Sequence, residues 1–294
     1  MRENLFKHVY NLSETIGERC VDMGFYMNLC TARDYIVNEF EAMGYDVELQ
    51  NYLCKGKEVS NIIVTKRGTE EGEILICGHY DSCEDTPGAD DNATAIAGVL
   101  EICRNLQFVQ TKKTLKFICF TNEEFPHYFG GTMGSMVYAK NARRICEPIE
   151  NVIVLEMLGC FSDEFGSQQY PDKRMEKIYP YTGDFIFVGG DKNSMGLVRD
   201  IDSSFQEGTI DVPIVSFPKN QMELFAFGKN PNLMRSDHVS FQKYSYPAVF
   251  VSDTGPFRNN FYHTKYDTWD TLNYTKMEEV VKGLTASVKY LANK

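Results

Sequence analysis

Histidines and carboxylates recur in this chain at points where apolar, strand-like runs end. Five such groups follow a predicted strand directly or lie in the loop after it: His79 with Asp81, Asp90 with Asp91, Glu123 with Glu124, Glu156, and His263. Because ligand sites in open α/β sheets lie beyond the carboxyl ends of the strands, we expect these side chains to meet at one sheet edge. Carboxylates gathered there would repel one another and raise each other's pKa unless cations held them. Imidazole and carboxylate ligands together suit Zn²⁺, Mn²⁺ or Co²⁺, and zinc is the default for two imidazoles and a hydrolytic role.

Each of these groups has a plainer interpretation when it is taken alone. A histidine after a strand is more often a loop or packing residue than a ligand. Asp90 and Asp91 precede a predicted helix, where acidic side chains serve as N-terminal caps. Glu156 is harder to explain in this way, because it ends an apolar run and burying an unpaired carboxylate costs several kcal/mol. The conjunction of the five groups, rather than any one of them, therefore predicts a metal site.

Alternating strands and helices are expected to position these groups. Apolar runs predict strands over residues 46–52, 59–65, 74–77, 115–121, 152–155 and 247–251. Apolar residues at helical spacing predict helices before Gly44 and over residues 93–106, 133–142 and 275–291. Residues 161–231 are harder to interpret and are expected to hold one or two strands and a helix near 194–205. This alternation predicts an α/β fold, with a mostly parallel, mixed central sheet and helices on both faces.

Composition and charge exclude several classes of protein. The 294 residues are 43% apolar and 24% charged, as in an ordinary soluble globular protein. Lysine and arginine number 30 against 41 aspartates and glutamates, and the net charge of −11 disfavours a nucleic-acid partner. No apolar run is long enough to span a membrane, and the first residues lack the apolar core of a signal peptide. No repeat or linker divides the chain, so we expect a single cytoplasmic domain over residues 1–294, with no membrane association.

The nine cysteines are an odd number and include no Cys-x-x-Cys pair. This usage fits a reducing compartment and gives no support to a disulfide framework or a structural zinc finger. Cys77 and Cys119 lie inside apolar runs, where cysteine behaves as a small hydrophobic residue. No cysteine has an obvious activating neighbour in the sequence, so we expect structural roles for the whole set. The set is Cys20, Cys30, Cys54, Cys77, Cys83, Cys103, Cys119, Cys146 and Cys160.

The order of these motifs resembles the co-catalytic zinc aminopeptidases of peptidase family 28. The resemblance runs from about Asn61 to Leu272. It rests on six motifs in order: His79-x-Asp81, Gly88-Ala89-Asp90-Asp91, Glu123-Glu124, Glu156, Ser236-Asp237-His238 and His263-Thr264. It implies the zinc-exopeptidase (phosphorylase/hydrolase-like) architecture, in a chain whose length leaves room for the catalytic domain alone. The family also contains carboxypeptidases, cyclotransferases and non-enzymatic receptor relatives.

The resemblance implies a ligand set for two zinc ions per chain. His79 and Glu156 would hold one zinc ion, and Glu124 and His263 would hold the other. Asp91, the second residue of the acidic pair, would bridge the two ions.

Two further residues have implied roles beside the ligands. Glu123 would be the general base, which takes the proton of a water shared by the metals and passes it to the leaving amine. Asp81 would accept a hydrogen bond from the His79 imidazole and fix its tautomer. The resemblance also implies a cis peptide bond between Asp91 and Asn92.

Several residues near the motifs are left open by the sequence. Ser236, Asp237 and His238 are consecutive and cannot form a serine-protease triad, so we interpret Asp237 and His238 as a buried helix cap near the site. Arg235 fits a role facing the substrate and a surface ion pair equally well. His127 is better explained as a loop histidine than as part of the site's rim. Two aromatic residues fit a pocket wall about as well as simple packing: Phe257 and Phe261.

The predicted function is that of a zinc-dependent aminopeptidase acting on short peptides with a free N-terminus. The α-amine would be attracted by the uncommitted oxygens of Glu123 and Glu156 beside one zinc ion. The alternatives are a glutaminyl-cyclase-like acyltransferase with one zinc ion, a carboxypeptidase, and a non-catalytic binding protein on the same fold. The complete ligand set argues against the first and the last of these. The preferred side chain and the oligomeric state do not follow from the sequence.

Overall fold

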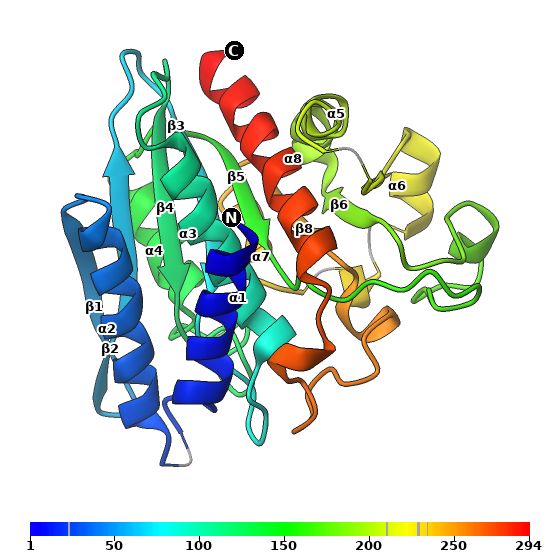
Figure 1. Ribbon diagram of the computed structural model, residues 1–294. Helices are drawn as coiled ribbons and strands as arrows, with labels where there is room; N and C mark the ends of the chain where they lie inside the picture. The colour runs from blue at the N-terminus through cyan, green and yellow to red at the C-terminus, as the bar shows by residue number, and fades with distance from the viewer. Residues whose placement is uncertain (23, 210, 228–229, 234) are drawn as a thin grey trace.

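Eight strands form a mixed sheet at the centre of the molecule (Figure 1). The computed structural model describes residues 1–22, 24–209, 211–227, 230–233 and 235–294. Across the sheet these described strands have the order β1-β2-β4-β3-β5-β8-β6-β7. Their bounds are β1 Val47–Cys54, β2 Lys57–Lys66, β3 Glu73–His79, β4 Thr114–Phe120, β5 Ile149–Leu155, β6 Ile186–Gly190, β7 Ile214–Phe217 and β8 Ala248–Ser252.

The middle of the sheet is parallel, and its flanks reverse direction. β4, β3, β5 and β8 run parallel to one another. The pairs β1–β2, β2–β4 and β8–β6 are antiparallel, and β7 runs parallel to β6. Every residue of β3 is buried, as expected for a strand that is covered on both faces. The mixed and mostly parallel sheet predicted from the sequence is therefore confirmed.

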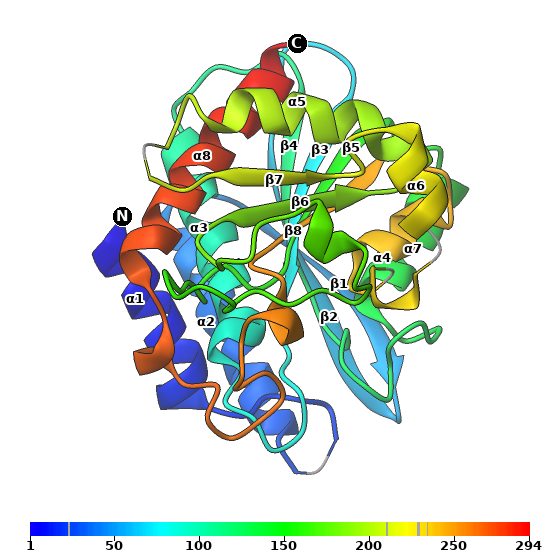
Figure 2. The same cartoon turned by 90° about the vertical axis from the view of Figure 1, so that its right-hand side faces the viewer.

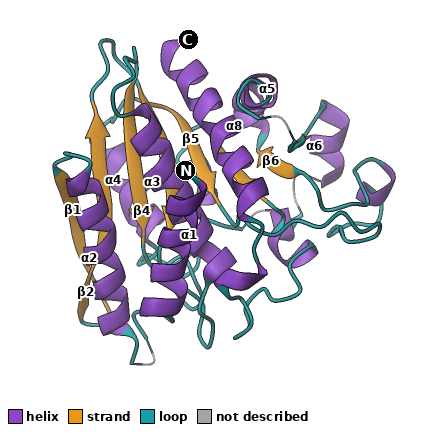
Figure 3. Cartoon of the chain, viewed as in Figure 1, coloured by secondary structure: helices purple, strands orange, loops and turns teal. Residues whose placement is uncertain are grey.

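Helices cover both faces of the sheet, as predicted, in front of the strands and behind them (Figure 3). One face packs against an apolar cluster that five helices share: α1 Arg2–Tyr10, α2 Tyr26–Ala42, α3 Ala95–Leu106, α5 Met195–Phe205 and α8 Tyr274–Asn293. The other face packs against α4 Gly134–Arg144 and α7 His238–Gln242. Both faces need this cover because successive side chains of a strand point to opposite sides. The short helix α6, Gln221–Phe227, follows β7 near the sheet end that Figure 2 brings toward the viewer.

The predicted elements are present, with small shifts at their ends. The strand expected over residues 74–77 extends over Glu73–His79, so His79 is itself the last residue of β3. The segment 161–231 holds α5 where a helix was expected, together with β6 and β7. α6 was not predicted, because the scattered Gly, Pro and Asp residues of this segment obscure the apolar periodicity. Within the described residues, no helix is both long enough and apolar enough to cross a membrane.

The register of the parallel strands brings four chain segments together at one edge. β3 and β4 end side by side, with His79 paired to Phe120. β5 and β8 end in the same way, with Leu155 paired to Val251. The residues that follow these strands therefore emerge next to one another, on the side of the sheet where α/β proteins bind their ligands.

Gly134 joins the first turn of α4 to the end of β4, and it has no room for a side chain. Its N–H donates to the Thr121 carbonyl oxygen at 2.8 Å, and a Cβ on Gly134 would lie 2.5 Å from that oxygen. We predict that Gly134→Ala lowers the free energy of unfolding by about 1–3 kcal/mol, because α4 must move away from the strand end. Urea unfolding followed by circular dichroism measures this change.

Gly196 offers a matched control, since it also lies in the first turn of a helix, α5. No described atom outside its own helix lies within 4 Å of the position that its Cβ would take. Gly196→Ala should therefore leave the unfolding midpoint unchanged or raise it. A Gly134→Ala protein as stable as the wild type would contradict the proposed crowding.

Candidate metal centre

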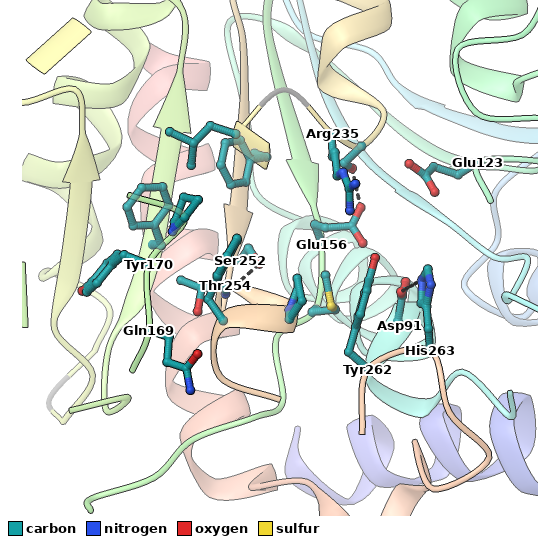
Figure 4. Close-up of a pocket in the computed structure, with 18 of the residues that line it drawn as sticks. Asp91, Glu123, Glu156, Gln169, Tyr170, Arg235, Ser252, Thr254, Tyr262 and His263 are labelled. Carbon is teal, nitrogen blue, oxygen red and sulfur yellow. Dashed lines mark hydrogen bonds and ion pairs between the residues drawn. The ribbon is translucent and has the colours of Figure 1, made fainter. Parts of the chain in front are cut away.

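The five side chains proposed as metal ligands meet at the carboxyl edge of the parallel strands. Figure 4 labels three of them, Asp91, Glu156 and His263. His79 ends β3, Glu124 lies in the loop after β4, and Glu156 follows β5 directly. Asp91 lies in the turn before α3, and His263 lies in the long loop after β8. The expectation that these residues share one sheet edge is confirmed.

The five side chains form two groups that meet at Asp91. In the first group, His79 Nε2 lies 3.3 Å from Asp91 Oδ1 and 3.4 Å from Glu156 Oε1. In the second group, His263 Nε2 lies 3.1 Å from Asp91 Oδ2 and 3.3 Å from Glu124 Oε1. Each oxygen of Asp91 thus faces a different histidine, which is the arrangement expected of a carboxylate shared by two metal ions.

Two buried carboxylates of these groups, Glu124 and Glu156, lack enough positive charge around them. Asp91, Glu124 and Glu156 are at most 7% exposed. Burial, and then the charge of Asp91, raises the pKa of Glu124 to about 7, and burial also raises the pKa of Glu156. Among the described atoms, neither Asp91 Oδ1 nor Glu124 Oε1 has a hydrogen-bond partner. Metal ions would relieve both the repulsion and the missing contacts, so the residues present fit a pair of bound cations.

Burial lowers the pKa values of the two histidines, whereas the neighbouring carboxylates raise them. Burial lowers the pKa of His79, but Glu156 and the neighbouring carboxylates outweigh it and raise that pKa well above its usual value. Asp91 and Glu124 likewise outweigh burial at His263 and raise its pKa. Burial raises the pKa of Asp91, but His263 and His79 outweigh burial and hold that pKa below its ordinary range. Since an imidazole binds metal in its neutral form, metal binding would displace these protons.

Glu123 lies beside the two groups without joining either. Its Oε2 is 4.0 Å from His79 Nε2, and its side chain lines the cavity next to the groups. Burial raises the pKa of Glu123 well above its usual value; the charge of His79 opposes this, and the charges of Glu124 and Glu156 add to it. A raised pKa makes this carboxylate a stronger proton acceptor than an exposed glutamate, which is the property that a general base needs.

Asp81 holds the loop that carries Glu123 and Glu124. Its carboxylate oxygens accept hydrogen bonds from the backbone N–H groups of Glu123 at 3.2 Å and Glu124 at 3.1 Å. The sequence predicted a hydrogen bond from His79 to this carboxylate. The carboxylate oxygens instead bind the two backbone N–H groups, and they lie farther from His79 than the backbone oxygen of Asp81 does. The nearest acceptor to His79 Nδ1 is the backbone oxygen of Asp81 at 3.2 Å, and the carboxylate oxygen is 3.5 Å away. Asp81 therefore orients both the imidazole and the acidic loop.

Asn92 fixes the backbone on both sides of Glu156. Its Nδ2 donates to the carbonyl oxygen of Leu155 at 3.2 Å, and its Oδ1 accepts from the N–H of Met157 at 3.0 Å. The peptide bond between Asp91 and Asn92 is cis, as the motif resemblance implied. The end of β5 and the turn before α3 are therefore locked together through one amide side chain.

Ser236, Asp237 and His238 lie near the centre and do not form a triad. Ser236 donates a hydrogen bond to Glu156 Oε2, so the Glu156 oxygen that was expected to stay free for a substrate amine already has a partner. Asp237 and His238 are buried as predicted, and Asp237 occupies the N-cap position of α7. The prediction of a capping side chain is wrong, because Asp237 makes no cap hydrogen bond. Burial lowers the pKa of His238 to about 3, which keeps its imidazole neutral.

A cavity of about 530 Å³ opens beside the metal groups (Figure 4). One end is polar and is lined by Asp91, Glu123, Glu124, Glu156, Tyr262 and His263. The other end is mainly apolar and is lined by Tyr170, Met175, Phe187, Leu233, Phe250 and Phe257, among others. Such a cavity can hold a reacting polar group at one end and an apolar side chain at the other.

The structure also shows where the residues lie whose roles the sequence left open. Phe257 lines the cavity, whereas Phe261 is absent from its described lining and is 41% exposed. Arg235 lines the cavity (Figure 4). His127 is a loop histidine as predicted, with Nε2 3.0 Å from Asp22 Oδ2.

Tyr262 received no role from the sequence, yet its hydroxyl points toward Glu156 at the polar end of the cavity (Figure 4). Its ring stacks on the His263 imidazole, with ring centroids 3.8 Å apart. Burial, followed by the charges of Asp91 and the neighbouring glutamates, raises the pKa of Tyr262, so the phenol stays protonated and can donate a hydrogen bond. The sequence offered one signal for a role of Tyr262 in the site: this residue directly precedes the ligand candidate His263.

Comparison with known proteins gives matches over nearly the whole chain. The model of the family described as Peptidase family M28 matches residues 61–196 and 197–288. An uncharacterized Escherichia coli K12 protein, YfbL, is 34% identical over 291 residues, which cover 96% of this chain and 86% of that protein.

Solved structures with the same fold include enzymes of two kinds. A zinc aminopeptidase from Bacillus subtilis, BSAP, superposes with a TM-score of 0.75 at 14% identity, over 100% of this chain and 96% of that one. A glutaminyl cyclase from Porphyromonas gingivalis superposes with a TM-score of 0.70 at 18% identity, over 99% of this chain and 97% of that one. Because the sequence identities are so low, these structural similarities establish the fold alone.

We predict that Asp81→Asn weakens metal binding by about 10–100-fold, the scale seen when a residue behind the ligands is replaced. An amide can offer only one acceptor oxygen, so one backbone N–H of the Glu123–Glu124 loop loses its partner. Titration of the zinc-loaded protein with a chelator measures the effect. Asp163→Asn, at an exposed aspartate, is the control and should bind zinc as the wild type does. Unchanged zinc retention in Asp81→Asn would show that the loop needs no such support.

Proposed function

Because the chain belongs to peptidase family M28, we propose that it is a zinc-dependent aminopeptidase with two zinc ions per chain. The observation that carries this proposal is the position of Asp91 between two imidazole–carboxylate pairs, with 3.3 Å to His79 on one side and 3.1 Å to His263 on the other. Asp91 and four further ligands, His79, Glu156, Glu124 and His263, provide nitrogen and oxygen donors that suit zinc. We also propose that residues 1–294 act as one catalytic domain, since a single sheet takes its strands from Val47 to Ser252.

Bound zinc would supply Lewis-acid polarisation of the scissile carbonyl and acidify the attacking water. Glu123 faces the same space, accepts the proton of that water and returns it to the leaving amine. Nearby cations lower the pKa of a carboxylate, so they would oppose the effect of burial on Glu123 and favour its deprotonated form, which a base needs. Tyr262 donates its phenol hydrogen bond to the carbonyl oxygen as negative charge develops there.

The cavity supports a substrate with an apolar first residue and a free α-amine. The amine is attracted to the acidic end, where Glu123 is the remaining uncommitted carboxylate now that Ser236 occupies Glu156 Oε2. The first side chain then extends toward Met175, Phe187 and the other apolar residues of the far end. Large apolar residues such as leucine, methionine and phenylalanine fit this space best.

A carboxypeptidase is the second candidate, and Arg235 is the observation that favours it. Its guanidinium lines the cavity and has the geometry to bind a C-terminal carboxylate. A glutaminyl-cyclase-like transferase with one zinc ion is a third candidate on the same fold, and the number of bound metals separates it from the proposal.

The proposed centre binds two zinc ions per chain, and elemental analysis of the purified protein measures the number. Asp91→Ala should disturb both sites, because only this residue faces both histidines. Glu124→Ala should disturb only the site of His263. One tightly bound zinc in the wild type, with no second ion even under added zinc, would favour the glutaminyl-cyclase-like alternative.

Glu123→Gln should lower kcat by at least ~10²-fold, because the amide keeps the shape of the side chain and cannot accept a proton. Its zinc content should equal that of the wild type, since Glu123 joins neither metal group. Glu124→Gln is the matched neighbour and should lose zinc from one site. Most of the wild-type activity surviving in Glu123→Gln would rule out its role as the base.

Acetylation of the substrate's N-terminus should abolish hydrolysis, with the loss in kcat/KM, because the amine no longer anchors the transition state. The measurement compares a leucine-led peptide with its acetylated form. A third peptide, amidated at its C-terminus, should be cleaved as fast as the free one. Equal turnover of acetylated and free peptides would contradict the aminopeptidase proposal and favour an endopeptidase or a carboxypeptidase. Dependence on the free C-terminus would favour the carboxypeptidase.

A further inference from the structure

A cysteine lies inside the second metal group. The Sγ atom of Cys83, an oxygen of Glu124 and a ring nitrogen of His263 all lie within 4.8 Å of one another. Cys83 belongs to the loop that leaves β3 after His79, so the same strand end that presents one imidazole also brings this thiol to the centre. Its side chain is half-buried. The expectation that every cysteine is structural does not account for this position.

A second observation shows that this corner of the site is built to receive a ligand. Glu124 is 6% exposed, and its Oε1 atom has no hydrogen-bond partner among the described atoms. That oxygen lies 3.3 Å from His263 Nε2, on the group that contains the thiol. A buried carboxylate oxygen without a partner is costly, and a cation between it, the imidazole and the thiol would satisfy all three.

We propose that Cys83 is a ligand of the second zinc ion, together with Asp91, Glu124 and His263. The inference deepens the proposed function and rests on its dinuclear centre. On binding, the thiol releases its proton to solvent and the sulfur donates an electron pair to the metal. Zinc in catalytic sites can expand from four ligands to five, so a fourth protein donor still leaves a position for the water that the proposed function needs.

This assignment makes the two halves of the centre chemically different. The first group offers nitrogen and oxygen donors from His79, Glu156 and Asp91. The second adds a soft thiolate, which favours zinc or cobalt over manganese and magnesium. A thiolate also lowers the net charge of the second site, so this zinc ion is held more tightly and polarises its other ligands less.

Cys160 provides a matched control within the same structure. Its sulfur also lies in a group with two carboxylates, Asp90 and Asp253. Those carboxylates are already occupied: Asp90 accepts from the N–H of Gly159 and from Asn259, and Asp253 accepts from the N–H groups of Cys160 and Gly255. The acidic pair there is satisfied by the protein itself, so we expect no metal on Cys160.

X-ray absorption at the zinc edge tests the proposal on the wild-type protein loaded with two zinc ions. One sulfur bound to one of the two zinc ions should give a scattering shell at about 2.3 Å with an average of half a sulfur per zinc. Cys83→Ser should lose this shell, and Cys160→Ser should keep it. A two-zinc wild-type protein with nitrogen and oxygen neighbours only would overturn the assignment while leaving the proposed function intact. A protein that binds no second zinc ion would overturn both.

Two further readouts do not depend on activity. Chelator titration of Cys83→Ser should release the second zinc ion at a concentration at least ~10-fold lower than in the wild type, and the first ion should be retained as before. Alkylation read by mass spectrometry should find Cys83 protected in the zinc-loaded protein and reactive after chelation. The exposed Cys146 should react equally in both states. Equal reactivity of Cys83 with and without zinc would contradict ligation.

Discussion

The close approach of buried carboxylates at one sheet edge is the constraint on which the rest of this structure depends. Asp91, Glu123, Glu124 and Glu156 share one small space and are at most 8% exposed. A single unpaired buried charge costs several kcal/mol, and the net stability of a whole domain is only about 5–15 kcal/mol. The rigid parallel strands must therefore supply the free energy that keeps these groups together. Metal binding returns part of that free energy, so metal affinity and stability are linked in this fold.

The acidic residues are held in place chiefly by side chains that bind the backbone groups of their loops. Asp267 accepts hydrogen bonds from the N–H groups of Asp90 at 2.9 Å and Asp91 at 3.1 Å, as Asp81 does for the loop after β4. The fully buried Arg19 donates to carbonyl oxygens of the segments that flank the centre, including Tyr80 at 2.7 Å. Burial lowers the pKa of Arg19 only to about 10, so it stays charged and offsets part of the negative charge. The ligands are thus held by loops whose backbone groups are fixed by hydrogen bonds with Asp81, Asp267 and Arg19.

The strand ends and the ligand candidates could be predicted because both leave local signals. A run such as Val152–Leu155 marks a strand, and a carboxylate directly after it must stand at the sheet edge. Contacts that depend on packing between distant segments leave no such signal. Cys83 reaches His263 only because the loops after β3 and β8 fold back over the same edge, and Ser236 reaches Glu156 from the segment directly before α7. The apolar wall of the cavity left no local signal either, since much of it comes from the segment between β5 and β8, whose pattern is hard to interpret.

The reversal of strand direction between β8 and β6 separates the part of the sheet that carries metal-ligand candidates from the part near the apolar wall of the cavity. The parallel half carries His79, Asp91, Glu124 and Glu156, whereas much of the apolar wall comes from the segment between β5 and β8. Mutations in that segment can reshape the wall without moving any strand that presents a ligand. Selection can therefore alter which molecules are accepted while the chemistry is inherited unchanged. A fold arranged in this way is evolvable: one half conserves a reaction, and the other is free to diversify.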